Sequence, residues 1–250
     1  MEDIEANDLE EKDLKNKDPE QQRLMNETCI LVDENDHMIG FASKKKCHLL
    51  KNIQKGMLHR AFSVFLFDQK GDLLLQKRAN KKITFPGRWT NTCCSHPLKV
   101  IGEYGGSIET SIEGVKRAAQ RKLYHELGIV ASQVPLEKFH YLTRVQYKAE
   151  SDGIWGENEI DYILFIQTNV DLKLNPNEVE LARYVDKDDL REMLKCKGVI
   201  VFLNKSLIYI LLEFSFTPWF ELICRSLMFF WWDSLHNLNA VKDQLSIIRM

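Results

Sequence analysis

The chain has 250 residues, of which 44% are hydrophobic and 28% charged, and its formal net charge is -2. This composition is typical of a globular protein with one sizeable core, and it disfavours nucleic acid as the main partner because no broad basic field exists. Small anionic ligands need only a local basic pocket and remain possible. The first 26 residues lack the apolar core of a signal peptide, so the six cysteines are expected to lie in a reducing compartment.

The first half of the chain predicts an N-terminal arm, two hairpins and a helix. Residues 1–26 are charged and poor in apolar side chains, which predicts a disordered or loosely helical arm before a domain spanning 27–250. Hairpins are expected within 29–42 and 61–78, where apolar runs flank polar turns. A loop-rich stretch at 85–106 follows. Apolar residues at helical spacing then predict a helix over 111–128, which Gly128 is suited to end.

The second half mixes strand-like and helix-like segments without a regular βαβ alternation. Residues 141–149 and 160–170 predict strands, and 186–198 predict a short amphipathic helix. The aromatic run at 226–232 is expected to pack on the core within a final helix. Together these elements indicate a single α+β domain.

A strongly apolar segment at 199–216 reads VIVFLNKSLIYILLEFSF. It has the minimum length for a membrane span, but Lys205 and Glu213 within it argue against stable membrane insertion.

The stretch TNTCCSHP at 90–97 contains the candidate reactive groups Cys93, Cys94 and His96. A reducing compartment disfavours a disulfide here, and no Cys-x-x-Cys zinc motif is present. Two interpretations remain, a working thiol and part of a metal site.

The stretch WGENEIDY places Glu157 and Glu159 on one face of a strand, because side chains alternate with a period of two. Two adjacent carboxylates need a cation, or one must keep its proton. The alternative is a solvated strand end. With His48, His59 and His96 they would form a set of three nitrogen and two oxygen donors, suited to octahedral Mn²⁺, Mg²⁺ or Zn²⁺. The sequence alone does not bring these residues together.

The helix ends in RKLYHELGI, which resembles a degenerate Nudix box. Lys122 and His125 replace two metal-binding glutamates of the hydrolytic form, and Glu126 remains. A hydrolase that splits a diphosphate needs several carboxylates to hold its cations, so the equipment for hydrolysis is depleted. Glu126 can still hold one Mg²⁺ that carries a diphosphate.

Five motifs in chain order carry a wider resemblance. They read CHLL…KGMLHRAFSVFLF, ITFPGRWTNTCCSHPL, RAAQRKLYHELGI, YKAESDGIWGENEIDYIL and TPWF…WWDSLHNLN. From about residue 29 to the end, the chain resembles type 1 isopentenyl-diphosphate Δ-isomerase in its eukaryotic form. The resemblance implies a Nudix-like mixed sheet flanked by helices. It also implies the conversion of isopentenyl diphosphate to dimethylallyl diphosphate through a carbocation-like intermediate.

The resemblance also implies roles for individual residues. It places acid/base groups at Cys94 and Glu159 on opposite faces of the substrate, assisted by Tyr147, and an aromatic ring facing the reacting carbons at Trp219. It implies a site for Mg²⁺, Mn²⁺ or Zn²⁺ and a second site for the Mg²⁺ that the diphosphate carries. The implied ligands are His48, His59, His96, Glu157 and Glu159 for the first ion and Glu126 for the second. The implied diphosphate contacts are Lys44, Arg78, Lys82 and Lys122.

Two segments depart from the family pattern, residues 98–114 and about 199–215. The second is interpreted as an apolar insertion that the family lacks, with the composition of a short intron translated in frame, and it lies close to Trp219. Two other functions stay open, a Nudix-type diphosphohydrolase and an inactive splice form that acts only as a binding protein. The expected state is a monomer in the cytoplasm. The C-terminal Ile-Arg-Met is a poor match to a peroxisomal signal, so the peroxisome is the alternative location.

Overall fold

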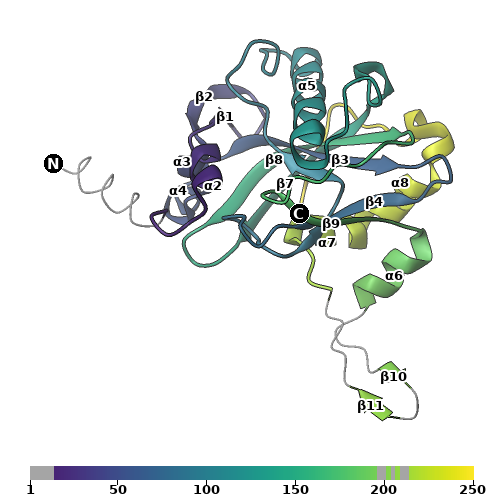
Figure 1. The fold of residues 1–250 in the computed structure, drawn as a ribbon. Helices are drawn as coiled ribbons and strands as arrows, with labels where there is room; N and C mark the ends of the chain where they lie inside the picture. The colour runs from purple at the N-terminus through teal and green to yellow at the C-terminus, as the bar shows by residue number, and fades with distance from the viewer. Residues whose placement is uncertain (1–13, 196–200, 204–205, 209–213) are drawn as a thin grey trace.

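A computed structural model describes residues 14–195, 201–203, 206–208 and 214–250 (Figure 1). Its centre is a ten-stranded mixed sheet with the strand order β12-β7-β8-β3-β1-β2, and β4, β5, β6 and β9 join it beside β3. The strands are β1 (Thr28–Val32), β2 (Met38–Ser43), β3 (His59–Phe67), β4 (Leu73–Arg78), β5 (Trp89–Thr90), β6 (Cys93–Ser95), β7 (His140–Glu150), β8 (Gly156–Gln167), β9 (Val179–Val185) and β12 (Ile247–Arg249). The predicted α+β class is confirmed.

Strands β3 and β8 form the middle of the sheet. They run parallel, with His59 beside Glu159 and Phe67 beside Gln167 at the two ends of the register. All nine residues of β3 are buried, as are eleven of the twelve in β8. Parallel strands covered on both faces are expected to be continuously apolar. The polar residues near the start of both strands therefore stand out from this pattern.

Helices cover both faces of the sheet and create two separate cores. On one face lies α5 (Ile108–Leu127), packed on a cluster that includes Val64, Leu123 and Tyr162. On the opposite face lie α7 (Pro218–Ile223), the π-helical η2 (Cys224–Met228) and α8 (Phe229–Asp233) (Figure 1). Trp231 and Trp232 are buried in this second core, which confirms that the aromatic run packs on the core within helical structure.

The predicted helix over 111–128 is confirmed and begins three residues earlier. Ser107 accepts a hydrogen bond from the Thr110 backbone, and the Thr110 side chain accepts one from the Ser107 backbone, so a capping box fixes this end. At the other end Gly128 adopts φ 71°, the left-handed conformation that glycine tolerates best. Within the stretch expected to be loop-rich, short pairings with β4 and β3 form β5 and β6.

The arm predicted over residues 1–26 is described from residue 14 onward. Its helix α2 (Pro19–Leu24) is capped by Asp18, and it is followed by α3 (Lys44–His48) and α4 (Leu50–Gln54) after the first hairpin. Leu14 and Met25 are buried in a cluster with Leu49, Ile83 and Trp155. A few apolar side chains thus dock the end of this otherwise polar arm on the domain predicted to begin at residue 27.

The remaining elements are peripheral. They are η1 (Leu136–Lys138), α6 (Lys187–Lys195), η3 (Leu235–Val241) and the antiparallel pair β10 (Val201–Leu203) and β11 (Ser206–Ile208). The predicted strands over 141–149 and 160–170 and the short helix within 186–198 correspond to β7, β8 and α6. The predicted insertion at 199–215 lies mostly outside the described residues. Within the part of the chain that is described, no helix is long and apolar enough to cross a membrane.

Candidate active site

Three histidines and one glutamate meet at the start of the central strands. His48 ends α3, His59 begins β3 and His96 follows β6. The Oε1 atom of Glu159 on β8 lies 3.8 Å from His48 Nε2, 3.0 Å from His59 Nε2 and 2.7 Å from His96 Nε2. All four side chains are buried, and their potential ligand atoms lie within 4.8 Å of one another. The fold therefore brings together four of the five predicted ligands.

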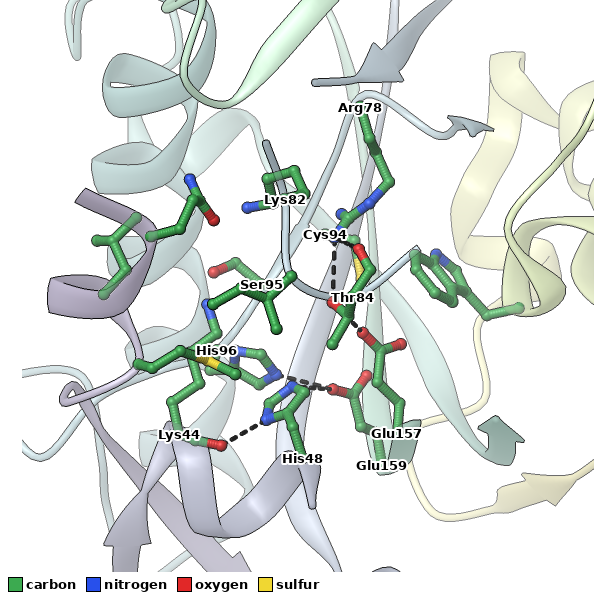
Figure 2. Close-up of a pocket in the computed structure, with 15 residues that line it drawn as sticks. Lys44, His48, Arg78, Lys82, Thr84, Cys94, Ser95, His96, Glu157 and Glu159 are labelled. Carbon is green, nitrogen blue, oxygen red and sulfur yellow. Dashed lines mark hydrogen bonds and ion pairs between the residues drawn. The ribbon is translucent and has the colours of Figure 1, made fainter. Parts of the chain in front are cut away.

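The donor set of this group suits a divalent cation. Nδ1 of His48 lies 2.7 Å from the Lys44 carbonyl oxygen, so its proton belongs there and Nε2 faces the group as an acceptor (Figure 2). This Nε2 atom is buried without a hydrogen-bond partner. Imidazole nitrogens and a carboxylate oxygen are common ligands of Zn²⁺, Mn²⁺ and related ions. The buried His/Glu group could thus bind a metal ion.

Burial and mutual repulsion favour neutral imidazoles at His48 and His96. Burial acts the same way on His59, but Cys47 and Glu159 outweigh it and raise the pKa of this imidazole above its ordinary value. Burial and the neighbouring histidines hold the pKa of His48 well below its usual range, and burial lowers the pKa of His96 to about 4. Burial alone would raise the pKa of Glu159, but contacts with His96 and His59 hold it well below its ordinary value. Neutral imidazole and ionised carboxylate are the forms that bind metal ions.

Glu157, the fifth predicted ligand, lies apart from this group. Its Oε1 accepts a hydrogen bond from Thr84 at 3.4 Å, and its Oε2 accepts one from the Tyr147 hydroxyl at 3.1 Å. Burial and the charge of Glu159 raise the pKa of Glu157 to about 8. The Tyr147 hydroxyl also makes a short hydrogen bond to Glu159. Tyr147 therefore bridges the two carboxylates.

Cys94 lies on the same face of the sheet as these carboxylates. It is the middle residue of β6 and pairs with Ser63 on β3. Burial and the charge of Asp161 raise the pKa of its thiol well above the ordinary value. Cys93 belongs to the core under α5, on the opposite face. The alternation of side chains along a strand thus gives the two neighbouring thiols different environments.

The predicted acid/base residues share one small cavity of about 30 Å³ (Figure 2). Cys94 and Glu159 both line it, with Trp219 beside them. Helix α2 and the residue after it contribute a further wall. The remaining lining residues are Gln21, Leu24, Met25, Lys44, His48, Arg78, Lys82, Ile83, Thr84, Ser95, His96 and Glu157. The cavity therefore combines basic, acidic and aromatic groups in a space that holds about one water molecule.

Trp219 is held firmly in the cavity wall. Its Nε1 donates a 3.1 Å hydrogen bond to Asn91, and its ring stacks on Tyr147 with centroids 5.8 Å apart. The guanidinium of Arg78 lies 5.8 Å from the centre of the indole ring and donates to the Thr84 carbonyl at 2.7 Å. A fixed aromatic face of this kind attracts positive charge.

Lys122 and Glu126 are not among the residues that line this cavity. Nζ of Lys122 lies 3.1 Å from Glu126 Oε1 and 3.7 Å from Glu178 Oε2. Glu178 also accepts hydrogen bonds from Lys82 at 2.6 Å and from Gln21 at 2.8 Å. Burial alone would lower the pKa of Lys122, but Glu126 and Glu178 raise it above the ordinary range. These residues form a buried ion-pair cluster beside the cavity.

Several contributors were not expected from the sequence. Glu178 and Gln21 stand in segments without a recognisable motif, and Thr84 lies in the ITFPGRWTNTCCSHPL motif without an assigned role. The importance of all three follows from contacts more than 70 residues apart in the chain. Ser63 and Asp161 lie in strands that read as ordinary core. The sequence offers one signal for these two residues: Asp161 is a carboxylate in an otherwise apolar run, two residues after Glu159.

Comparisons with known proteins agree with this geometry. A model of the NUDIX domain family matches residues 57–200. A protein of Gibberella zeae named isopentenyl-diphosphate delta-isomerase is 57% identical over 93% of this chain and 87% of its own. Proteins of the same name from Schizosaccharomyces pombe and Bos taurus are 52% and 48% identical, over 92% and 100% of this chain and 94% and 100% of theirs.

The fold has a structural counterpart as well. A crystal structure of the Deinococcus radiodurans protein DR0079 matches 80% of this chain and 99% of its own, with a TM-score of 0.51 and 15% identity, which supports the fold alone. The Nudix-like fold expected from the sequence is thereby confirmed. From the match over most of its length, the chain belongs to the isopentenyl-diphosphate delta-isomerase family, whose members carry a NUDIX domain.

Proposed function

We propose that this protein converts isopentenyl diphosphate to dimethylallyl diphosphate. One observation carries the proposal, the convergence of Cys94, Glu159 and Trp219 on a single enclosed cavity beside a buried His/Glu group. The reaction adds a proton to the terminal alkene carbon and removes one from the carbon nearer the diphosphate. The double bond thereby shifts by one position toward the diphosphate. Two acid/base groups and a stabilised cation are therefore required.

Cys94 and Glu159 are the proposed acid/base pair, on opposite faces of the substrate. Cys94 comes from β6 and Glu159 from β8, on either side of the central strand β3. Tyr147 assists Glu159 through their hydrogen bond, which both holds the carboxylate in place and offers a route for its proton.

Trp219 is proposed to stabilise the carbocation-like intermediate through its ring face. Water must be kept away, because it would trap the cation as an alcohol. Leu24 and Met25 line the cavity on the side of α2, where their apolar side chains limit the access of water.

The basic side chains of Lys44, Arg78 and Lys82 line the cavity and are proposed to bind the diphosphate, with Lys122 behind them. His48, His59, His96 and Glu159 would hold a divalent ion, with Glu157 as a fifth ligand after a rotation of its side chain. Such an ion, Mg²⁺, Mn²⁺ or Zn²⁺, orients Glu159 and tunes its basicity when bound.

Glu126 is proposed to receive the Mg²⁺ that the diphosphate carries. At present its partners are Lys122 at 3.1 Å and Gln76 at 2.9 Å. This arrangement disfavours a Nudix-type hydrolase, because an ammonium group holds the one glutamate that remains of the three metal-binding positions in the Nudix box. Among the described residues, one group of three or more potential metal ligands is brought together, and it does not involve α5.

Analysis of the products distinguishes isomerase from hydrolase. The purified protein is incubated with isopentenyl diphosphate and Mg²⁺, and the organic products and free phosphate are quantified separately. Dimethylallyl diphosphate without phosphate release is the expected result. Phosphate release without that product would favour the hydrolase. The absence of both products would favour the inactive binding protein.

We also propose that the protein is a monomer whose partner is the small-molecule substrate. Its proposed location is the cytoplasm, with the peroxisome as the alternative.

A further inference from the structure

Asp161 is a buried carboxyl group for which neither the metal group nor the cavity accounts. It lies on β8 two residues after Glu159, on the same face, and is 0% exposed. Its Oδ2 accepts a 2.7 Å hydrogen bond from Ser63, and its Oδ1 is buried without a partner. Along this face the next residues, Ile163 and Phe165, belong to the apolar core.

A carboxyl group in this position is costly to the fold. A polar group taken from water without full hydrogen bonding costs about 1–3 kcal/mol in proteins, and more if it is charged. An apolar side chain would continue the pattern of Ile163 and Phe165 without that cost. Buried polar groups that remain unsatisfied in native structures call for an explanation of this kind.

The partner of Asp161 leads directly to Cys94. Ser63 stands opposite Cys94 in the antiparallel pairing of β3 and β6, so their side chains lie on the same face at about 5 Å between Cβ atoms. The neighbouring Ser63 hydroxyl also acts to lower the pKa of the Cys94 thiol. A serine hydroxyl has one hydrogen and two lone pairs, so it can serve Asp161 and Cys94 together.

We propose that Asp161 is a positioning residue for Cys94, acting through the Ser63 hydroxyl. A serine hydroxyl rotates freely unless a hydrogen bond fixes it. The hydrogen bond from Ser63 to Asp161 fixes this hydroxyl. The fixed hydroxyl then holds the Cys94 sulfur toward the cavity. This inference rests on the proposed function, since it concerns the geometry of the thiol in the isomerisation step.

The positions of Ser63 and Asp161 predict that their substitution changes kcat rather than KM. Neither Ser63 nor Asp161 is among the residues that line the described cavity. Their loss should therefore leave substrate binding nearly intact and slow the proton transfer at Cys94. Displacing a reacting group by a fraction of its hydrogen-bond length costs about 10- to 100-fold in rate.

The test uses four variants of the full chain. Asp161→Leu keeps the number and branching of the side-chain heavy atoms and removes the hydrogen bond. Asp161→Asn keeps the shape and a hydrogen-bond acceptor, and Ser63→Ala removes the mediating hydroxyl. The double variant Asp161→Leu/Ser63→Ala measures their coupling. We expect Asp161→Leu and Ser63→Ala each to lower kcat about 10- to 100-fold with KM within about threefold. Asp161→Asn should stay within about threefold of wild type, and the double variant should be no slower than the slower single variant.

Thr143→Val is the matched control, because it removes another buried hydroxyl, on β7, that has no hydrogen-bond partner. It should leave kcat unchanged. The inference is overturned if folded Ser63→Ala keeps the wild-type kcat, if the two single effects multiply in the double variant, or if Asp161→Asn is as slow as Ser63→Ala. Should Asp161→Leu not fold, Ser63→Ala and Asp161→Asn decide alone. Absence of isomerase activity in the wild type would instead overturn the proposed function.

Discussion

Cys93 and Cys94 are neighbours in the chain, yet they face two regions of very different character. On the side of Cys93, the buried charges are matched, with Lys122 against Glu126 and Glu178. On the side of Cys94, three imidazoles converge on one carboxylate, and nitrogen atoms of all three are buried without partners.

This comparison distinguishes buried charges that stabilise the fold from buried groups that are available for binding and catalysis. Removing one member of a buried ion pair leaves the other with the full desolvation cost. Buried polar groups without a partner in the protein are instead suited to bind an ion or a ligand. We therefore expect changes in the His/Glu group to act mainly on catalysis, and a change at Glu178, which has no proposed role in substrate binding, to act mainly on stability.

The largest effect on catalysis short of the thiol itself is expected from Glu159→Gln. The amide keeps the shape of the side chain but loses the negative charge that faces the three histidines and the basicity needed for proton transfer. We expect kcat to fall about 10³-fold and the bound metal content to decrease, measured by enzyme assay and elemental analysis. Glu150→Gln, an exposed change on the neighbouring β7, is the control. If Glu159→Gln kept the wild-type kcat, the His/Glu group would not be the catalytic region that we propose.

Glu178→Gln should act on the free energy of unfolding. It removes the partner of Lys82 and a neighbour of Lys122, at a cost of about 3 kcal/mol. Burial alone would raise the pKa of Glu178, but Lys82 and Lys122 hold it well below the ordinary value of 4.5. A depressed carboxyl pKa contributes stability that is complete above that ordinary value and is lost as the pH falls toward the folded-state pKa.

Urea unfolding of wild type and Glu178→Gln at several pH values tests this reasoning. The difference in stability should be greatest near neutral pH and shrink below about pH 4.5. Burial lowers the pKa of Lys82 to about 8 even beside Glu178, so both groups are charged near pH 7. A difference that grows as the pH falls would contradict the assignment of a charged, stabilising Glu178.

The smallest effect is expected from deletion of residues 199–213. The predicted insertion lies close to Trp219 in the sequence, but the described contacts of this ring come from Asn91, Tyr147, Phe85 and Arg78. The deletion retains Phe214 and Ser215, whose contacts with Trp89 join the segment to the sheet. We expect kcat within about threefold of wild type by the same assay, since positioning at the reacting centre is preserved. A loss above tenfold would show that the segment supports the site.

The sequence predicted best where a local pattern is repeated several times. Helix α5 combined helical spacing, a glycine that ends it and an apolar face, and it formed with both ends close to those expected. Strands β7 and β8 had comparable support. Family motifs then identified His48, His59, His96 and Glu159 as a group, which the distances bear out.

Other features depend on contacts that no local pattern contains. Strand β6 has three residues and exists because β3 pairs with it, so its stretch resembled a loop. The segment around α2 has the composition of a disordered or loosely helical arm, since Leu14 and Met25 on either side of the helix find apolar partners only in Leu49, Ile83 and Trp155. The orientation of Glu157 toward Thr84 and Tyr147 likewise depends on side-chain packing between strands.

The central claim is that the thiol on one face of β6 performs chemistry and the thiol on the other does not. The most direct test compares Cys94→Ala with Cys93→Ala in the conversion of isopentenyl diphosphate to dimethylallyl diphosphate. Our account predicts a loss of at least about 10³-fold in kcat for Cys94→Ala and a change below about threefold for Cys93→Ala, both proteins being folded. Full activity in Cys94→Ala, or equal losses in both, would contradict it.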